Sequence, residues 1–372
     1  MNTPFKQNEA DPCWYHFISS TMIIQILINV DDGLVLVVGK DSKEHMAKLI
    51  EELMKDYKLT VNEKIVNFLG MNLTWDPKGT WVKISMEGKI KELAKILHLE
   101  KHKQVAGPMA PDFDTSALPD DHVNYHEPFP TIFGKVLFIK TQRSDISISV
   151  IKLAPFMQKY SKYHWDALMH LCKYLDQTID YGMFIKCSVN WQVTKTKIYC
   201  ISDAGELANT KSNSRSIIGS VLFVEGNIIS FKSKTTTCIT TDAAHSELIA
   251  LYSATKIVKA IENLFVSLCP ILLEKPITLF GDNLASLWIS RTKNNSTRTK
   301  HYNLKLHYIY EQITNETLVT KHIPTADCLA DFLTKIQAHP LFIKHRSFFV
   351  ARIIEELHDF IPPNADKSDI SK

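Results

Sequence analysis

An apolar run that ends on an acid opens the most regular part of the chain: Ile198-Tyr199-Cys200-Ile201-Ser202-Asp203. Its β-branched and aromatic side chains are typical of a buried strand. Two further apolar runs follow, Ile217 to Val224 and Ile228 to Phe231, with the turn residues Glu225-Gly226-Asn227 between them. This pattern predicts one strand followed by a hairpin.

Helical and strand patterns alternate after that hairpin. Helical spacing runs from Ala243 to Lys259 and again from Asn283, and short apolar runs at Ile277 to Phe280 and Leu318 to Ile323 predict two more strands. Thr325 to Lys335 predicts a last short helix. Five strands interleaved with helices indicate a mixed α/β domain over residues 195–340.

The region before residue 195 predicts a different organisation. Ile23 to Val30 and Leu34 to Val38 form an apolar hairpin pattern around Asp31-Asp32-Gly33, and strand and helix patterns continue to about His98. A segment rich in proline and aspartate follows, and then a helical region from about Thr131 to Leu175. We therefore predict domains at 1–110, 111–194 and 195–340, and an amphipathic, then polar, tail at 341–372.

Composition excludes several classes of protein. The 372 residues carry a formal net charge of +3, and the seven cysteines contain no Cys-x-x-Cys pair, so neither a disulfide framework nor a zinc site is expected. The apolar stretch from Met22 to Gly39 contains Asp31 and Asp32, which argue against a membrane span. Because no secretion signal is evident, we expect a cytoplasmic or nuclear protein without a membrane partner.

Four acidic side chains stand at positions that could carry chemistry. Asp203 and Asp282 follow predicted strands, and the other two, Glu247 and Asp331, lie in predicted helices. Ligands of open α/β sheets gather at the carboxyl ends of strands, so the four could converge. The alternative for any single aspartate is a turn or helix-cap role, which is the commoner one.

Four converging carboxylates would repel one another unless cations lay between them. Magnesium is the expected cation because it prefers oxygen ligands. Two such ions can activate a water and stabilise the leaving oxygen in phosphodiester cleavage. We therefore expect two Mg²⁺ ions, with Mn²⁺ as a substitute.

Short motifs in one order make this part of the chain resemble the ribonuclease H domain of copia-type retrotransposon Pol polyproteins. The motifs are Ile201-Ser202-Asp203-Ala204, Ser214-Arg215-Ser216-Ile217-Ile218-Gly219, Ile229-Ser230-Phe231-Lys232-Ser233-Lys234, Ser246-Glu247-Leu248-Ile249-Ala250-Leu251, Asp282-Asn283, Arg298-Thr299-Lys300-His301 and Ala330-Asp331-Phe332-Leu333-Thr334-Lys335. The resemblance implies a mixed five-stranded sheet. It also implies that Asp203, Glu247, Asp282 and Asp331 are catalytic metal ligands, with Asp327 as the rival for the last position.

The resemblance extends towards the N-terminus. Val30-Asp31-Asp32 resembles the metal-binding hairpin of reverse transcriptases, and Phe68-Leu69-Gly70 resembles the segment that joins palm to thumb. Arg143-Ser144-Asp145-Ile146 is similar to part of the copia-type connection region. The expected architecture is therefore a partial reverse-transcriptase palm and thumb, a helical connection and a ribonuclease H-like domain.

The polymerase part departs from the family pattern. Only 30 residues precede Asp31, and they contain no strand with the further metal-binding aspartate that a polymerase needs. We therefore interpret Asp31 and Asp32 as a vestigial metal site and expect no reverse transcription by this chain alone. The missing portion of Pol, or another Pol chain, is a conceivable partner.

A basic and aromatic segment follows Asp282. It contains Arg291, Lys293, Arg298, Lys300 and Lys305 and no acidic residue up to Tyr310. Such a segment suits the phosphate backbone of an RNA–DNA hybrid or another nucleic acid, although a solvated helix face is an equal alternative. The predicted function is metal-dependent hydrolysis of RNA in RNA–DNA hybrids. The alternative is a catalytically inactive retrotransposon remnant that at most binds nucleic acid.

Overall fold

The computed structural model describes residues 5–99, 101–110, 112–113, 125–187, 195–205, 215–240, 242–268, 273–292 and 303–363. The chain divides into two compact units. The first comprises Met1–Leu69 with Lys259–Leu273, and the second comprises Gly70–Val258 with Glu274–Lys372.

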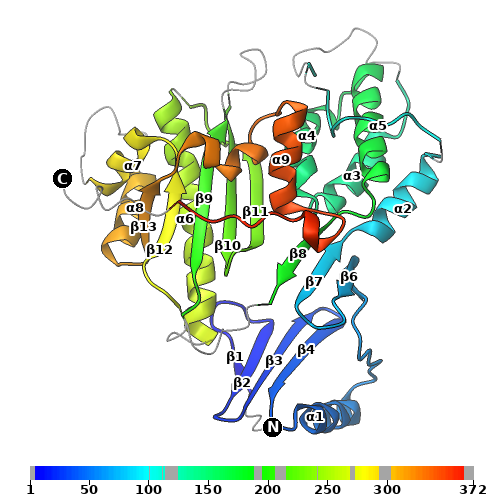
Figure 1. Ribbon diagram of the computed structural model, residues 1–372, viewed down its shortest axis with the longest axis vertical. Helices are drawn as coiled ribbons and strands as arrows, with labels where there is room; N and C mark the ends of the chain where they lie inside the picture. Colours follow the sequence, from blue (N-terminus) through cyan, green and yellow to red (C-terminus); the bar gives the residue numbers. More distant parts are fainter. Residues whose placement is uncertain are drawn as a thin grey trace. The chain divides into compact units, whose positions relative to one another are not determined.

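An antiparallel sheet in the order β1-β2-β3-β4 forms the centre of the first unit (Figure 1). Its elements are β1 (Lys6–Gln7), β2 (Trp14–Ile18), β3 (Met22–Asn29), β4 (Asp32–Gly39) and the helix α1 (Ser42–Asp56). The predicted hairpin is confirmed, because β3 and β4 pair as far as Asn29↔Asp32 and leave Val30 and Asp31 at the tip. None of the described helices is both long and apolar enough to cross a membrane.

The second unit contains the five-stranded sheet that the sequence predicts. Its strands are β9 (Ile198–Gly205), β10 (Ile217–Val224), β11 (Asn227–Thr235), β12 (Ile277–Gly281) and β13 (Leu318–His322). The strand order is β11-β10-β9-β12-β13 (Figure 1). β10 pairs antiparallel with both β9 and β11, whereas β12 pairs parallel with both β9 and β13. Every residue of the central strand β9 is buried, so both faces of the sheet are covered.

Different elements cover the two faces of this sheet. The surrounding elements are α6 (Ala243–Leu268), α7 (Leu284–Arg291), α8 (Asn303–Thr314), and the 3₁₀ turns η6 (Thr325–Asp327) and η7 (Leu329–Leu333). Ala204 and Ile218 pack against Ile249 and Ala250 of α6. Successive side chains of a strand point to opposite faces, so Asp203 belongs to the other face. On this second face, η7 packs closely against β10.

A second group of elements completes this unit. It consists of β6 (Met71–Trp75), β7 (Trp81–Ser85), β8 (Gly182–Lys186), α2 (Glu87–Ile96), α3 (Phe129–Ile139), α4 (Ser147–Leu153), α5 (Lys162–Gln177), α9 (His339–Phe349) and the 3₁₀ turns η2 (Ser144–Ile146), η3 (Ala154–Phe156) and η8 (Ile354–Glu356); the short strand β5 (Asn67–Phe68) precedes it in the chain. Strand β8 pairs with β7, so contacts cross the predicted boundary at residue 110. The boundaries at 110, 194 and 340 stay predictions.

The segment from Thr325 to Lys335 does not form the predicted helix. It forms the two 3₁₀ turns η6 and η7, with Cys328 between them in a non-helical conformation. The N–H of Thr334 donates to the carbonyl of Asp331, an i→i+3 bond of 3.1 Å. A Cβ atom on Gly219 of β10 would lie 2.8–3.1 Å from atoms of Thr334, Ala330 and Leu333. The local pattern gave no indication that close packing on this glycine would replace a regular helix.

Candidate active site

The register of the parallel strands brings two of the predicted carboxylates together. Phe280 of β12 pairs with Ile201 of β9. Two residues further along each strand stand Asp282 and Asp203, so the two aspartates lie side by side where β12 has ended. Asp203 is buried and Asp282 is half-buried.

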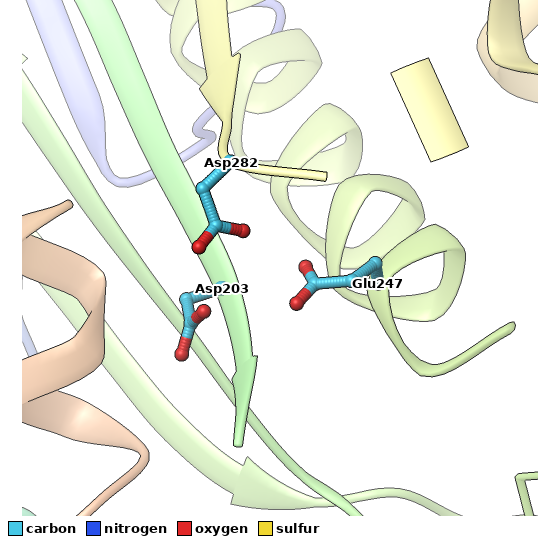
Figure 2. Close-up of side chains that lie close together, drawn as sticks. All are labelled: Asp203, Glu247 and Asp282. Atoms are coloured by element: carbon cyan, nitrogen blue, oxygen red, sulfur yellow. The ribbon is translucent and has the colours of Figure 1, made fainter. Parts of the chain in front are cut away.

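The third carboxylate comes from α6. Glu247 lies in the second turn of this helix, is buried, and accepts a 3.3 Å hydrogen bond at Oε1 from the N–H of Ala204. One oxygen each of Asp203, Glu247 and Asp282 lies within 4.8 Å of the others. Figure 2 shows the three carboxylates close together, with Asp203 on β9, Glu247 on α6 and Asp282 at the end of β12. Within the described part of the chain, no other group of three or more His, Cys, Asp or Glu side chains is placed like this.

Asp331, the predicted fourth ligand, is near these three residues but is not part of the close triad. It lies on η7, and its Oδ1 is 2.7 Å from Nζ of Lys335. The same ammonium group is 3.9 Å from Oδ2 of Asp203, so Lys335 links the two carboxylates. The rival Asp327 is exposed on η6. The geometry therefore favours Asp331 over Asp327 at the edge of the site, and its role as a ligand stays a prediction.

Burial and mutual repulsion dominate the electrostatics of the triad. Burial, followed by the charge of Asp331, raises the pKa of Asp203 to about 7, although Lys335 and the Thr334 hydroxyl act in the opposite direction. Burial, followed by the charges of Asp203 and Asp282, raises the pKa of Glu247 to about 9. Carboxylates with raised pKa values hold negative charge at a cost that a cation would remove.

The donor atoms fit a divalent cation of the magnesium type. All three groups offer carboxylate oxygens, which such ions prefer to nitrogen or sulfur. Oδ1 of Asp203 is buried and has no hydrogen-bond partner, a costly state for a carboxylate oxygen. Its other oxygen, Oδ2, accepts from the Thr334 hydroxyl. The triad could therefore hold a cation through an oxygen that the protein itself leaves unsatisfied.

Glu247→Gln is expected to flatten the pH dependence of stability in the metal-free protein. The folded-state pKa of Glu247 is about 9, above its ordinary value. Its contribution to stability is therefore full below the unfolded pKa and is lost as the pH rises towards 9. At pH 8.5 in EDTA, the variant should melt at a temperature at least about 5 °C higher than the wild type, and near pH 5 the difference should be small.

Thermal melting with added Mg²⁺ or Mn²⁺ extends this measurement. The cations should raise the melting temperature of the wild type at pH 8.5, because they bind the triad only in the folded protein. They should have much less effect on Glu247→Gln, because this variant lacks one of the three carboxylates. The exposed Glu311 of α8 provides the matched control, Glu311→Gln, which should behave as the wild type. If the melting temperatures of wild type and Glu247→Gln changed equally with pH, the pKa of Glu247 would not be raised in the metal-free site.

Three positions next to Asp203 were not among the predicted site residues. Thr334 and Lys335 both contact Asp203, and Gly219 is the cross-strand partner of Asp203 on β10. All three residues belong to the quoted motifs, but the resemblance implies roles only for the acidic residues of those motifs. Gly219 allows η7 to approach the sheet, and η7 leads directly to Thr334 and Lys335.

Only two of the five predicted nucleic-acid-binding residues lie among the described residues. Arg291 at the end of α7 donates from Nε to the Thr320 hydroxyl at 3.0 Å and from Nη2 to the Thr320 carbonyl, so it anchors α7 to β13. Nζ of Lys305 on α8 lies 3.8 Å from Sγ of Cys238. Lys293, Arg298 and Lys300 lie outside the described residues. The binding role of all five stays a prediction.

The predicted vestigial polymerase site lies in the first unit. Asp31 is at the tip of the β3–β4 hairpin and Asp32 begins β4, and both are exposed. Among the described residues, no third His, Cys, Asp or Glu joins them in a close metal-binding group.

The fold and the site together define the class of the second unit. A mixed sheet in the order β11-β10-β9-β12-β13, with two carboxylates on its adjacent central strands and a third from the helix that follows the hairpin, is the arrangement of a ribonuclease H-like domain. This confirms the fold class that the motifs imply.

Sequence comparison shows that most of the chain is similar to retrotransposon Pol polyproteins. The chain is 26% identical over 331 residues to the retrovirus-related Pol polyprotein from transposon RE1 of Arabidopsis thaliana, covering 89% of this chain and 22% of the relative. It is 26% identical over 337 residues to the corresponding polyprotein from transposon TNT 1-94 of Nicotiana tabacum, covering 88% and 24%. These similarities confirm the predicted relationship to retrotransposon Pol polyproteins. The chain spans less than a quarter of the length of these relatives, and the narrower copia-type assignment stays a prediction.

Solved ribonuclease H structures align with part of the chain. The structure of LC11-RNase H1, isolated from compost, aligns with a TM-score of 0.29 and 22% identity over 37% of this chain and 92% of that one. No protein-family model matches the chain.

Proposed function

We propose that this chain acts as the ribonuclease H-type part of a retrotransposon Pol and hydrolyses RNA in RNA–DNA hybrids with the help of divalent cations. The observation that carries the proposal is the triad of Asp203, Glu247 and Asp282, whose oxygens lie within 4.8 Å of one another. Relationship to Pol polyproteins over 89% of the chain supports the hybrid as substrate, since reverse transcription generates such hybrids.

The three carboxylates of the triad would hold Mg²⁺, with Mn²⁺ as a substitute. A bound divalent ion supplies Lewis-acid stabilisation of the negative charge on the phosphate. Each carboxylate of the triad accepts a hydrogen bond from a different donor group of the protein, which orients it. The Thr334 hydroxyl donates to Asp203, the Ala204 N–H to Glu247, and the Thr325 hydroxyl to Oδ2 of Asp282 at 2.9 Å.

Lys335 adds a positive charge beside the triad. Its ammonium group contacts Asp331 at 2.7 Å, and its side chain is 40% exposed. The charges of Asp203 and Asp331 raise the pKa of Lys335, against the effect of its partial burial, so it stays protonated. We propose that Lys335 and Asp331 together position Asp203, and that Asp331 would help to hold a second ion.

We propose further that this chain by itself does not carry out reverse transcription. Asp31 and Asp32 are exposed, and no third ligand joins them among the described residues. Apolar side chains of the same unit are also exposed, among them Leu36 at 52% and Met54 at 52%. Surfaces of this kind suit a contact with a further part of Pol.

One preparation of the purified chain tests both statements. We expect it to cut labelled RNA in an RNA–DNA hybrid with Mg²⁺ or Mn²⁺ and not in EDTA, and to leave double-stranded DNA intact. It should not extend a DNA primer on an RNA template. Binding of the hybrid without cleavage at any metal concentration would favour the alternative, an inactive remnant, and primer extension would contradict the second statement.

A further inference from the structure

Three residues near Asp203 belong to the short turn η7 or directly follow it. The Thr334 hydroxyl donates to Oδ2 of Asp203, and the ammonium group of Lys335 lies 2.7 Å from Asp331 and 3.9 Å from Asp203. The carbonyl of Asp331 accepts from the N–H groups of Thr334 and Lys335, at 3.1 Å each. A 3₁₀ turn of this length has poor hydrogen-bond geometry and little stability by itself. Its neighbours must therefore hold it in place.

Besides the sheet, α9 supports η7 through aromatic contacts. Phe332 of η7 is buried, and its ring stacks on that of Phe349 with the centroids 5.0 Å apart. The ring of Phe342 lies 5.5 Å from that of Phe332. Phe342 and Phe349 are seven residues apart, which corresponds to two helical turns, so both belong to one face of α9. This face of α9 therefore packs on η7.

The helical region before residue 195 in turn holds α9. The rings of Phe342 and Tyr174 of α5 lie 6.0 Å apart, at an interplanar angle of 71°. Arg346, one turn further along α9, donates to the Tyr174 oxygen at 3.3 Å and to the Tyr181 oxygen at 3.1 Å. Its guanidinium also lies 4.5 Å from the centroid of the Tyr181 ring. Phe342 therefore contacts both η7 and α5.

A cavity of about 70 Å³ lies beside these contacts. Phe332, Lys335 and Phe342 line it, and so do Ile148 and Ser149 of α4. Truncating a buried side chain enlarges such a space, and the surrounding residues relax partly into it. A smaller residue in place of Phe342 would therefore let Phe332 and Lys335 shift from their places.

We propose that Phe342 is a positioning residue for the ribonuclease site. It holds Phe332, and through Phe332 it holds η7 where the Thr334 hydroxyl and the Lys335 ammonium group reach Asp203. The inference rests on the proposed function, because Asp203 belongs to the proposed metal site. It also goes beyond that function, because Phe342 lies outside the predicted ribonuclease domain. The catalytic unit therefore extends to α9 and to the α5 contact that holds it.

Cleavage kinetics of Phe342→Ala and Phe342→Leu, well below their melting temperatures, test this proposal. We expect kcat to fall at least about tenfold in Phe342→Ala and about threefold in Phe342→Leu, because small displacements of groups in an active site are costly. KM for the hybrid should change little, because Phe342 is buried and acts through η7. The matched controls are Phe156→Ala and Phe156→Leu. Phe156 is 5% exposed against 7% for Phe342, and its ring contacts are with Phe113 and His164.

Two further measurements separate positioning from a general loss of stability. Mg²⁺ should raise the melting temperature of Phe156→Ala as much as that of the wild type, but that of Phe342→Ala by less than about half as much, because Asp203 is then poorly placed for the cation. In a Lys335→Gln background, Phe342→Ala should lower kcat by much less than tenfold, because one contact through which Phe342 acts is already lost. If Phe342→Ala does not fold, the two leucine variants supply the same comparisons.

The outcomes distinguish this proposal from the proposed function. Equal losses of kcat and equal effects of Mg²⁺ in the Phe342 and Phe156 variants, with an active wild type, would overturn the positioning role and leave the proposed function standing. A wild type that never cleaves the hybrid would contradict the proposed function. The effect of Mg²⁺ on melting then decides the positioning role, since a reduced effect in the Phe342 variants alone supports it and an equal effect overturns it.

Discussion

Asp203→Asn is expected to lower the rate of RNA cleavage in a hybrid by at least about a hundredfold, the scale of losing one main electrostatic group from an active site. Asp203 contributes a buried Oδ1 that has no hydrogen-bond partner, and its carboxylate lies close to those of Glu247 and Asp282. The amide has nearly the same volume but no charge, so the cation would lose a ligand without a change in packing. Cleavage of labelled hybrid at saturating Mg²⁺ measures the effect.

Two controls separate this chemical effect from a loss of structure. The melting temperature of Asp203→Asn in EDTA at pH 8 should not fall, because burial makes the charge of Asp203 unfavourable and raises its pKa to about 7. Asp327→Asn, at an exposed position on η6, should cleave as fast as the wild type. Full activity of Asp203→Asn would remove Asp203 from the catalytic centre, and loss of activity in Asp327→Asn would reverse the choice between Asp327 and Asp331.

Arg143→Met is expected to destabilise the second unit by about 3–5 kcal/mol, the cost of leaving a buried charge without its partner. Arg143 and Asp145 are both fully buried and form a bidentate pair, with distances of 2.9 Å and 2.7 Å. Burial alone would raise the pKa of Asp145, but the Arg143 guanidinium holds it below its usual value. Methionine would fill much of the space and leave the Asp145 carboxylate buried and charged. Urea unfolding measures the loss.

The double variant Arg143→Met/Asp145→Leu distinguishes lost charge pairing from lost packing. It removes both charges and should recover most of the stability, because apolar replacement of a whole buried ion pair is often close to neutral. Arg143 also donates to the carbonyl of Thr178 at 2.9 Å, so recovery should be incomplete. If the single variant unfolds at the wild-type urea concentration, the pair contributes little to the stability of this unit.

The Arg143–Asp145 pair also shows how far a motif can be interpreted without a structure. The resemblance identified Arg143 and Asp145 as part of a connection region, but it implied no role for either. In the structure Asp145 also accepts from the Tyr174 hydroxyl at 2.7 Å, and Arg346 of α9 donates to the Tyr174 oxygen at 3.3 Å. This buried network joins η2, α5 and α9, segments that are far apart in sequence. Only their spatial arrangement reveals that the motif is structural.

Strand and helix periodicity, together with ordered motifs, predicted the mixed five-stranded sheet, its hairpin, the hairpin around Asp31 and the acidic residues that form the triad. These are local properties, because apolar alternation and turn residues depend on near neighbours in the sequence. Other features depended on contacts across long separations. The exclusion of Asp331 from the close triad, the Lys335 bridge and the 3₁₀ turns against Gly219 all arise where segments more than 100 residues apart meet. Burial and like charge at those meeting points set the pKa values of Asp203 and Glu247, and no pattern along the chain contains that information.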